Sequence, residues 1–217
     1  MALNHEEGLA ISGKTVLKLM RQEGLFFRYR RKRYSSYKGE QGRIAKNILN
    51  RGFGADRPLE KLVTDVTEFA VAGSKAYLSP VMDLYNNEIL SWSVSSHPNM
   101  TQINEMMDGL EEKLDGSKCI MHSDQGWQYQ QLSYQLRLER SGITQSMSRK
   151  ATCLDNACME SFFGHLKDEF YRGREFESFD DFAEQLDAYI EYWNEGRRQE
   201  RLKEMTPVEY RGHMRAA

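Results

Sequence analysis

Residues 61–94 read KLVTDVTEFAVAGSKAYLSPVMDLYNNEILSWSV, and the pattern of this stretch sets the expected fold. It contains three runs rich in β-branched and aromatic residues, a composition typical of strands. The runs cover residues 61–69, 76–84 and 88–94. Turn-forming residues separate them, namely VAGS at 71–74 and the pair Asn86-Asn87, whose side chains tolerate positive φ. The stretch therefore predicts three antiparallel strands joined by tight turns.

Helical and strand patterns alternate downstream of these strands. Apolar residues at helical spacing predict helices, and short apolar runs predict buried strands. The expected helices cover residues 101–114, 132–138, 156–170 and 179–192, and the expected strands cover residues 119–121 and 143–145. The resulting order, β-β-β-α-β-α-β-α-α, predicts an α/β fold, a mixed sheet with helices packed on its faces.

A short helix at residues 15–21, stopped by Gly24, and a basic arm precede this domain. Residues 14–50 carry a charge of +9, whereas the rest of the chain carries −11 of the net −2. In the arm, FFRYRRKRY at residues 26–34 interleaves cations with aromatic rings, which suits phosphate neutralisation and base stacking. The alternative is a solvated basic linker. We expect residues 1–56 to form the helical, basic arm with its linker and residues 57–217 to form the catalytic domain with its C-terminal helices.

Three acidic residues lie where a cation is the expected partner. Asp65 lies within the first expected strand, where a carboxylate is unfavourable without a positive neighbour. Asp124 follows a short apolar strand, at the edge where strand ends place functional groups. Glu160 lies on the helical face opposite the apolar stripe, in one row with Asn156 and Lys167. The three carboxylates are therefore candidates for a shared ion site.

The donor set indicates which ion that site would hold. Carboxylates without a thiolate or imidazole cluster favour magnesium or manganese over zinc. Two such ions about 4 Å apart can activate an attacking oxygen and stabilise a leaving one at phosphorus. We therefore predict that Asp65, Asp124 and Glu160 hold two Mg²⁺ or Mn²⁺ ions and catalyse phosphoryl transfer without a protein nucleophile.

Composition excludes several other classes. Apolar residues make up 40% of the chain, which is enough for a folded core. The chain has no apolar run of about eighteen residues and no secretion signal, so we expect no membrane span and a cytoplasmic location. Cys119, Cys153 and Cys158 are expected to be reduced thiols. A zinc site of Cys153, Cys158 and His165 is disfavoured because paired spacing and a fourth ligand are missing.

Motifs around the acidic residues resemble those of bacterial insertion-sequence transposases whose second reading frame (OrfB) carries a retroviral-integrase-like DDE catalytic core. They are TDVTEF at 64–69, HSDQGWQY at 122–129 and DNACMESFFGHLK at 155–167. YWNEGR at 192–197 and TPVEYR at 206–211 resemble the C-terminal signature of that family. The match covers nearly the whole chain.

The resemblance implies a ribonuclease-H-like fold and a transposase that cleaves and joins DNA strands, using Asp65, Asp124 and Glu160 as metal ligands. It also implies that Lys167 contacts a DNA phosphate. His122, Gln125 and Asn156 would shape the DNA-binding pocket, although a structural role for His122 is an open alternative. In the arm, the expected DNA-binding residues are Arg28, Arg30, Arg31, Lys32 and Arg33.

The sequence departs from the family at two positions and at its N-terminus. Leu62 stands where many members have Trp, and Gln199 stands where many have His. Members usually begin with further helical DNA-binding sequence, so we expect this chain to be truncated. The implied partners are DNA, at the ends of the insertion sequence and in the target duplex, further copies of the chain assembled on DNA, and a helix-turn-helix protein. The implied location is the bacterial nucleoid.

Two other functions compete with the DNA-joining enzyme. The first is a catalytically silent DNA-binding remnant that inhibits full-length transposase, which the short N-terminus favours. The second is a ribonuclease H that acts on RNA–DNA hybrids, which shares the expected fold and ions. The intact carboxylates favour the enzyme over the remnant, and the three motifs disfavour the ribonuclease.

Overall fold

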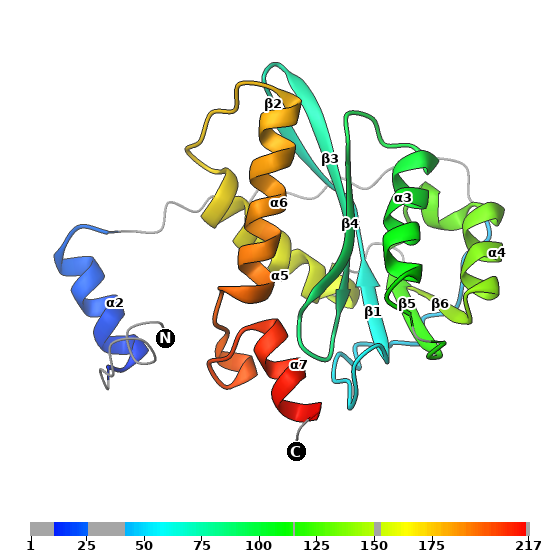
Figure 1. Cartoon of the computed structure of the whole chain (residues 1–217), viewed down its shortest axis with the longest axis horizontal. Coiled ribbons are helices and arrows are strands. Elements are labelled where there is room, and N and C mark those ends of the chain that lie inside the picture. Colours follow the sequence, from blue (N-terminus) through cyan, green and yellow to red (C-terminus); the bar gives the residue numbers. More distant parts are fainter. Residues whose placement is uncertain (1–10, 26–41, 115, 150–152, 216–217) are drawn as a thin grey trace.

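A computed structural model describes residues 11–25, 42–114, 116–149 and 153–215 (Figure 1). The strands are β1 (Lys61–Thr64), β2 (Thr67–Val71), β3 (Ser74–Asp83), β4 (Ile89–Ser95), β5 (Cys119–Ser123) and β6 (Ile143–Met147). The α-helices are α2 (Gly13–Gln22), α3 (Met100–Glu111), α4 (Leu132–Arg140), α5 (Ala157–His165), α6 (Phe179–Glu195) and α7 (Pro207–Arg215). Short 3₁₀ turns are η1 (Trp127–Gln130), η2 (Cys153–Asn156) and η4 (Glu200–Leu202), and η3 (Leu166–Tyr171) is a π-helix. These elements confirm the predicted α/β class.

The strands form one six-stranded mixed sheet. β3 pairs antiparallel with β4 on one side and with β1 and β2 on the other. β1 then pairs parallel with β5, and β5 pairs parallel with β6. The predicted three-stranded antiparallel unit is confirmed, and Asn87 in its second connection has the expected positive φ of 59°. The parallel half brings the ends of β1 and β5 to the same edge of the sheet.

The expected single strand over 61–69 is wrong in one respect, because it is interrupted at Asp65 and Val66. The pairing of β1 and β2 with β3 keeps one register, which places Pro80 opposite Asp65. Pro80 has no N–H to donate, and the Val66 N–H instead donates to Asp65 Oδ1 at 2.8 Å. Asp65 therefore lies in an interruption of the strand pairing with β3.

Helices cover both faces of the sheet, with α5 and α6 on one side and α3 and α4 on the other (Figure 1). Successive residues of β1 show the alternation, since Leu62 belongs to the core under α3 and Val63 to the core under α5 and α6. Leu62 is fully buried. Leucine thus fills the position where the family often has a larger side chain.

The predicted helix over 156–170 is divided into three segments. Residues up to Asn156 form the 3₁₀ turn η2, α5 carries Glu160, and the chain widens into η3. A π-helical widening changes which side chains share a face, so spacing along this segment departs from 3.6 residues per turn. C-terminal helix α7 lay outside the predicted elements.

The N-terminal helix α2 confirms the predicted short helix. Ser12 caps it by accepting the Thr15 N–H at 3.2 Å, and Gly24 ends it with a φ of 70°. No residue of α2 is buried. Among the described residues, no helix has the length and apolar character needed to cross a bilayer.

Candidate active site

Asp65 is held in the gap between β1 and β2 by two donors. Its Oδ1 accepts the Val66 N–H at 2.8 Å, and its Oδ2 accepts from Asn156 Nδ2 at 3.4 Å. Burial raises the pKa of Asp65 well above its usual value, and the negative charges of Asp124 and Glu160 raise it further. Lys167 lowers this pKa through its positive charge. Asp124, Glu160 and Lys167 are thus electrostatic neighbours of Asp65.

Asp124 follows β5 and reaches the same sheet edge as Asp65. The pairing of Val63 with His122 aligns the two strand ends. Asp124 Oδ1 accepts the Gly126 N–H at 2.8 Å. A Cβ at Gly126 would lie 2.9 Å from that oxygen and 2.6 Å from Gln128 Nε2, so a larger residue would require these two side chains to shift. The backbone therefore positions the second carboxylate.

Glu160 lies exposed in the first turn of α5. Asn156, immediately before this helix, is buried and donates through Nδ2 to Thr64 O at 3.3 Å as well as to Asp65. Its Oδ1 is buried and has no hydrogen-bond partner among the described residues. Asn156 therefore connects the start of the Glu160 helix to the Asp65 strand and leaves an acceptor oxygen beside the carboxylates.

The three carboxylates do not form a closed ligand set in this structure. Within the described ranges, no three His, Cys, Asp or Glu side chains surround one point as metal ligands do. Mutual repulsion opposes closer approach, and backbone N–H groups hold one oxygen each of Asp65 and Asp124. The donor chemistry still fits a hard cation, because carboxylate and amide oxygens are the ligands that Mg²⁺ and Mn²⁺ prefer.

Asp155 is a structural residue beside the site that the sequence analysis did not single out. It is fully buried and accepts five hydrogen bonds, from Asn47 Nδ2, Arg51 Nε, and the backbone N, Nε and Nη2 of Arg149. These bonds join residues 47–51 to the turn that carries Asn156. Its place directly before Asn156 in the third motif was the only available signal.

Lys167 and Gln125 both lie near the carboxylates and already have protein partners. Lys167 Nζ donates to Thr67 Oγ1 at 2.6 Å and lies 5.3 Å from the centroid of the Phe69 ring. Burial lowers the pKa of Lys167. Gln125 Nε2 donates to Ser148 O at 2.9 Å. A DNA contact by either side chain would therefore compete with these internal bonds.

His122 is fully buried, as in the structural alternative that its sequence position left open. Its Nδ1 lies 2.8 Å from Ser146 Oγ. That oxygen already accepts the N–H groups of Ile48 and Leu49, so its own hydrogen is directed to His122 Nδ1. Burial lowers the pKa of His122 to about 4. The histidine is thus neutral and supports the packing of residues 48–49 on β6.

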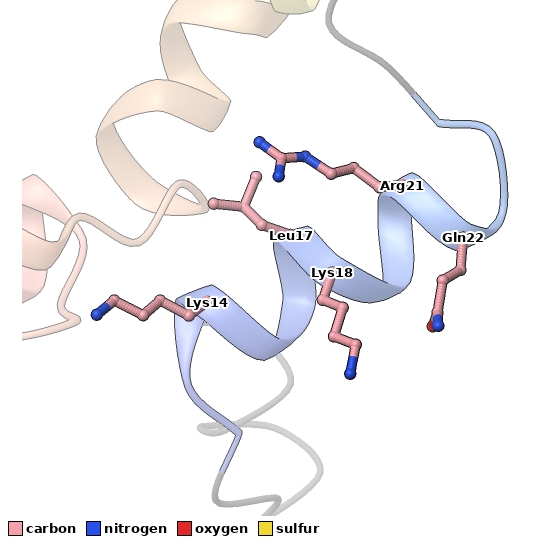
Figure 2. Close-up of a pocket in the computed structure, with 5 residues that line it drawn as sticks. All are labelled: Lys14, Leu17, Lys18, Arg21 and Gln22. Carbon is pink, nitrogen blue, oxygen red and sulfur yellow. The ribbon is translucent and has the colours of Figure 1, made fainter.

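The beginning of the basic region is visible on α2. Figure 2 shows Lys14, Lys18 and Arg21 extending from this helix around a shallow hollow that Leu17 and Gln22 also line. The five expected DNA-binding residues of the arm lie outside the described residues. They are Arg28, Arg30, Arg31, Lys32 and Arg33.

Comparison with known proteins identifies the family. Two family models, both described as integrase core domain, match residues 55–153 and 160–214. An uncharacterized transposase-like protein of Haemophilus influenzae is 47% identical over 97% of this chain and 98% of its own length. The chain belongs to the insertion-sequence transposases.

Other relatives agree with this assignment. InsK of insertion sequence element IS150 from Escherichia coli is 50% identical over 95% of this transposase chain and 74% of its own length. The transposase InsF of IS3A from the same organism is 32% identical over 94% of this chain and 72% of its own length. The family is one of enzymes that transfer phosphoryl groups on DNA.

Solved structures confirm the ribonuclease-H-like fold. A chain of the simian T-cell lymphotropic virus intasome in complex with the PP2A regulatory subunit B56 gamma has a TM-score of 0.62 at 14% identity, covering 92% of this transposase and 70% of that chain. The HTLV-2 integrase catalytic core in complex with magnesium has a TM-score of 0.57 at 12% identity, covering 72% of this chain and 98% of that one.

Proposed function

We propose that this transposase cleaves and joins DNA strands at Asp65, Asp124 and Glu160. The observation that carries the proposal is the grouping of these carboxylates at the end of β1 and β5, where the charges of Asp124 and Glu160 act on Asp65. Like charges raise one another's pKa only when they lie near each other, so the effect of Asp124 and Glu160 on Asp65 indicates that the three carboxylates are neighbours. A concentrated negative charge of this kind is suited to divalent cations.

Two Mg²⁺ or Mn²⁺ ions are the proposed cofactors, held by Asp65 and Asp124 with Glu160 completing one of the sites. The related fold of HTLV-2 integrase was solved with magnesium, which supports this choice. When bound, such ions supply positive charge to the reacting phosphate and activate the attacking oxygen. Oxygen-only ligands favour these ions over zinc.

The neighbouring residues position this machinery. Asn156 orients Asp65 through Nδ2, and its buried Oδ1 would be an available acceptor or ligand when an ion is bound. The Gly126 N–H holds Asp124. Lys167 places a positive charge near Asp65 and contacts a DNA phosphate once it leaves Thr67. Gln125 shapes the same pocket from the turn after β5.

A strand-transfer assay tests the proposal. The chain is incubated with Mg²⁺ and labelled oligonucleotide duplexes that carry the ends of its insertion sequence, and joined products are resolved on a gel. We expect metal-dependent nicking and joining. DNA binding without either product, together with inhibition of a full-length transposase, would favour the silent remnant. Cleavage of an RNA–DNA hybrid instead of DNA duplex would favour the ribonuclease.

The basic arm is proposed to supply most of the non-specific affinity for DNA. Each cation that neutralises a phosphate contributes about −0.9 to the log–log dependence of affinity on salt. Replacing all five arm cations by glutamine is therefore expected to flatten that slope by up to about 4.5. The slope is measured by fluorescence anisotropy. Substitution is preferable to deletion of residues 1–50, because Leu49 is part of the core. An unchanged slope would mean that the arm is only a linker.

Recognition of specific ends is proposed to need a partner or additional chain. Phosphate contacts carry no sequence information, and base reading needs an element such as a recognition helix that enters a groove. Of the described helices, only α2 precedes the catalytic domain, and its ten residues cannot form a helix-turn-helix. We expect the isolated chain to prefer terminal repeats over scrambled duplex by much less than about 10³ in competition binding. A preference above that ratio would show that the chain reads its own ends.

A further inference from the structure

A second polar pocket lies between α5, the end of α6 and η4. Its volume is about 440 Å³, which is in the range of small-ligand sites. We call it the arginine pocket and define it by Ser161, His165, Trp193, Arg197, Gln199 and Arg201, which are among the residues that line it. Most of these side chains are hydrogen-bond donors. The pocket therefore suits a ligand that is rich in acceptor oxygens.

A chain of hydrogen bonds leaves one donor unsatisfied in this pocket. Arg201 Nη1 can only donate, and it lies 2.8 Å from Asn87 Oδ1. Asn87 must then donate through Nδ2, which lies 2.8 Å from Gln199 Oε1. The Gln199 amide is thereby oriented with Nε2 as its remaining donor. Gln199 is only 8% exposed, and its Nε2 has no partner among the described residues.

The positive charges of the pocket are unequally compensated. Arg197 pairs with Glu169 at 2.7 Å, and Arg198 pairs with Glu209 at 2.9 Å. Arg201 is exposed and, in the part of the chain that the structure describes, bonds only to neutral oxygens, those of Asn87 and Leu84. An anion would therefore find the uncompensated guanidinium of Arg201 and the unsatisfied amide of Gln199 together. Guanidinium groups match the oxygens of phosphate particularly well.

The pocket shares helix α5 with the proposed catalytic residue Glu160. Ser161 follows Glu160 directly, and both are exposed on α5. The α5 residues that line the pocket are centred on the helix face that points away from Glu160, so the pocket is separate from the carboxylate site. We propose that the arginine pocket binds a backbone phosphate of DNA bound by this transposase, through Arg201 and Gln199. This proposal rests on the proposed function.

Two variants that change the charge by the same amount test it. Gln199→Glu keeps the oxygen that accepts from Asn87 but places a negative charge where Nε2 was, and Arg201→Gln removes the uncompensated cation. Affinity for a short labelled duplex is measured by anisotropy at several salt concentrations. Each variant is expected to bind about tenfold more weakly and to flatten the salt slope by about 0.9, the loss of one phosphate contact.

The control is Asn104→Asp, which makes the same charge change at an exposed position of α3, on the opposite face of the sheet. It is expected to bind nearly as the wild type does. Glu200→Gln, which removes an acid from the pocket lining, is expected to tighten binding. Urea unfolding verifies that each variant is folded.

Three results would overturn the proposal. They are wild-type affinity and slope in both folded test variants, equal losses in the control, and quenching of tryptophan fluorescence by inorganic phosphate without any change in DNA affinity. The last would identify a site for small anions. Strand joining by the wild-type chain is measured in parallel. Joining with unchanged binding by the variants would refute only the phosphate pocket, whereas no joining by the wild type would refute the proposed function itself.

Discussion

Replacing Asp124 by Asn is expected to abolish strand cleavage and joining while leaving the fold intact. The substitution preserves size and the acceptor oxygen for the Gly126 N–H, but it removes one ligand charge from the carboxylate cluster. Metal ions supply several kcal/mol of transition-state stabilisation, so the rate of joining should fall by about 10³-fold or more. The measurement is joined product per unit time with Mg²⁺.

Asp180→Asn provides the matched control, because Asp180 is exposed at the start of α6, outside the carboxylate cluster. It should retain wild-type activity. Binding of non-specific duplex should persist in Asp124→Asn, since the basic arm is the proposed source of that affinity. Near wild-type turnover by Asp124→Asn would exclude Asp124 as a metal ligand.

Replacing Asp155 by Asn is expected to lower the free energy of unfolding strongly. The carboxylate is fully buried and accepts five hydrogen bonds, three of them from guanidinium nitrogens. An asparagine would present an N–H group to these donors. Because Arg51 and Arg149 are themselves about half exposed, with 45% and 54% of their side chains accessible, water compensates part of the loss. We expect the free energy of unfolding to fall by about 2–4 kcal/mol.

The pH dependence of this effect has a definite sign. The hydrogen bonds from Arg149, and then those from Arg51, hold the pKa of Asp155 well below its usual value. A depressed pKa stabilises the fold above the unfolded pKa of about 3.9, and this stabilisation is lost as the pH falls further. Urea unfolding should thus show a full difference between wild type and Asp155→Asn at pH 7 that narrows below about pH 4.

A variant that lacks one arginine distinguishes the hydrogen-bond network of Asp155 from an ordinary surface ion pair. Arg51→Ala removes one donor and leaves Arg149 and Asn47 on the carboxylate, so its cost should be nearer 1 kcal/mol. Asp155→Asn should also slow strand joining under conditions where it is folded, because the turn that positions Asn156 would loosen. If Asp155→Asn had the same free energy of unfolding as the wild type at pH 7, the stabilising role proposed for Asp155 would be wrong.

Most elements of the sheet and its helices could be predicted from local pattern alone. Runs rich in β-branched and aromatic residues over 76–84 and 88–94 matched β3 and β4, and helical spacing over 101–114 matched α3. These patterns are short-range, because each reflects which face of one element is buried. The boundaries failed where a single residue overrode the pattern, as at the interruption beside Asp65.

The sequence by itself determined the family, the order of the elements and the three acidic candidates, because these are properties of neighbouring residues. Only the tertiary structure decided which side chains surround Asp65. Asn156 lies 91 residues from Asp65, and Asn47 lies 108 residues from Asp155, so neither bond has a local signature. Burial likewise assigned His122 to the interior. Such contacts form only when the chain folds and brings distant strands and turns together. Burial and hydrogen bonding depend on which residues are neighbours in space.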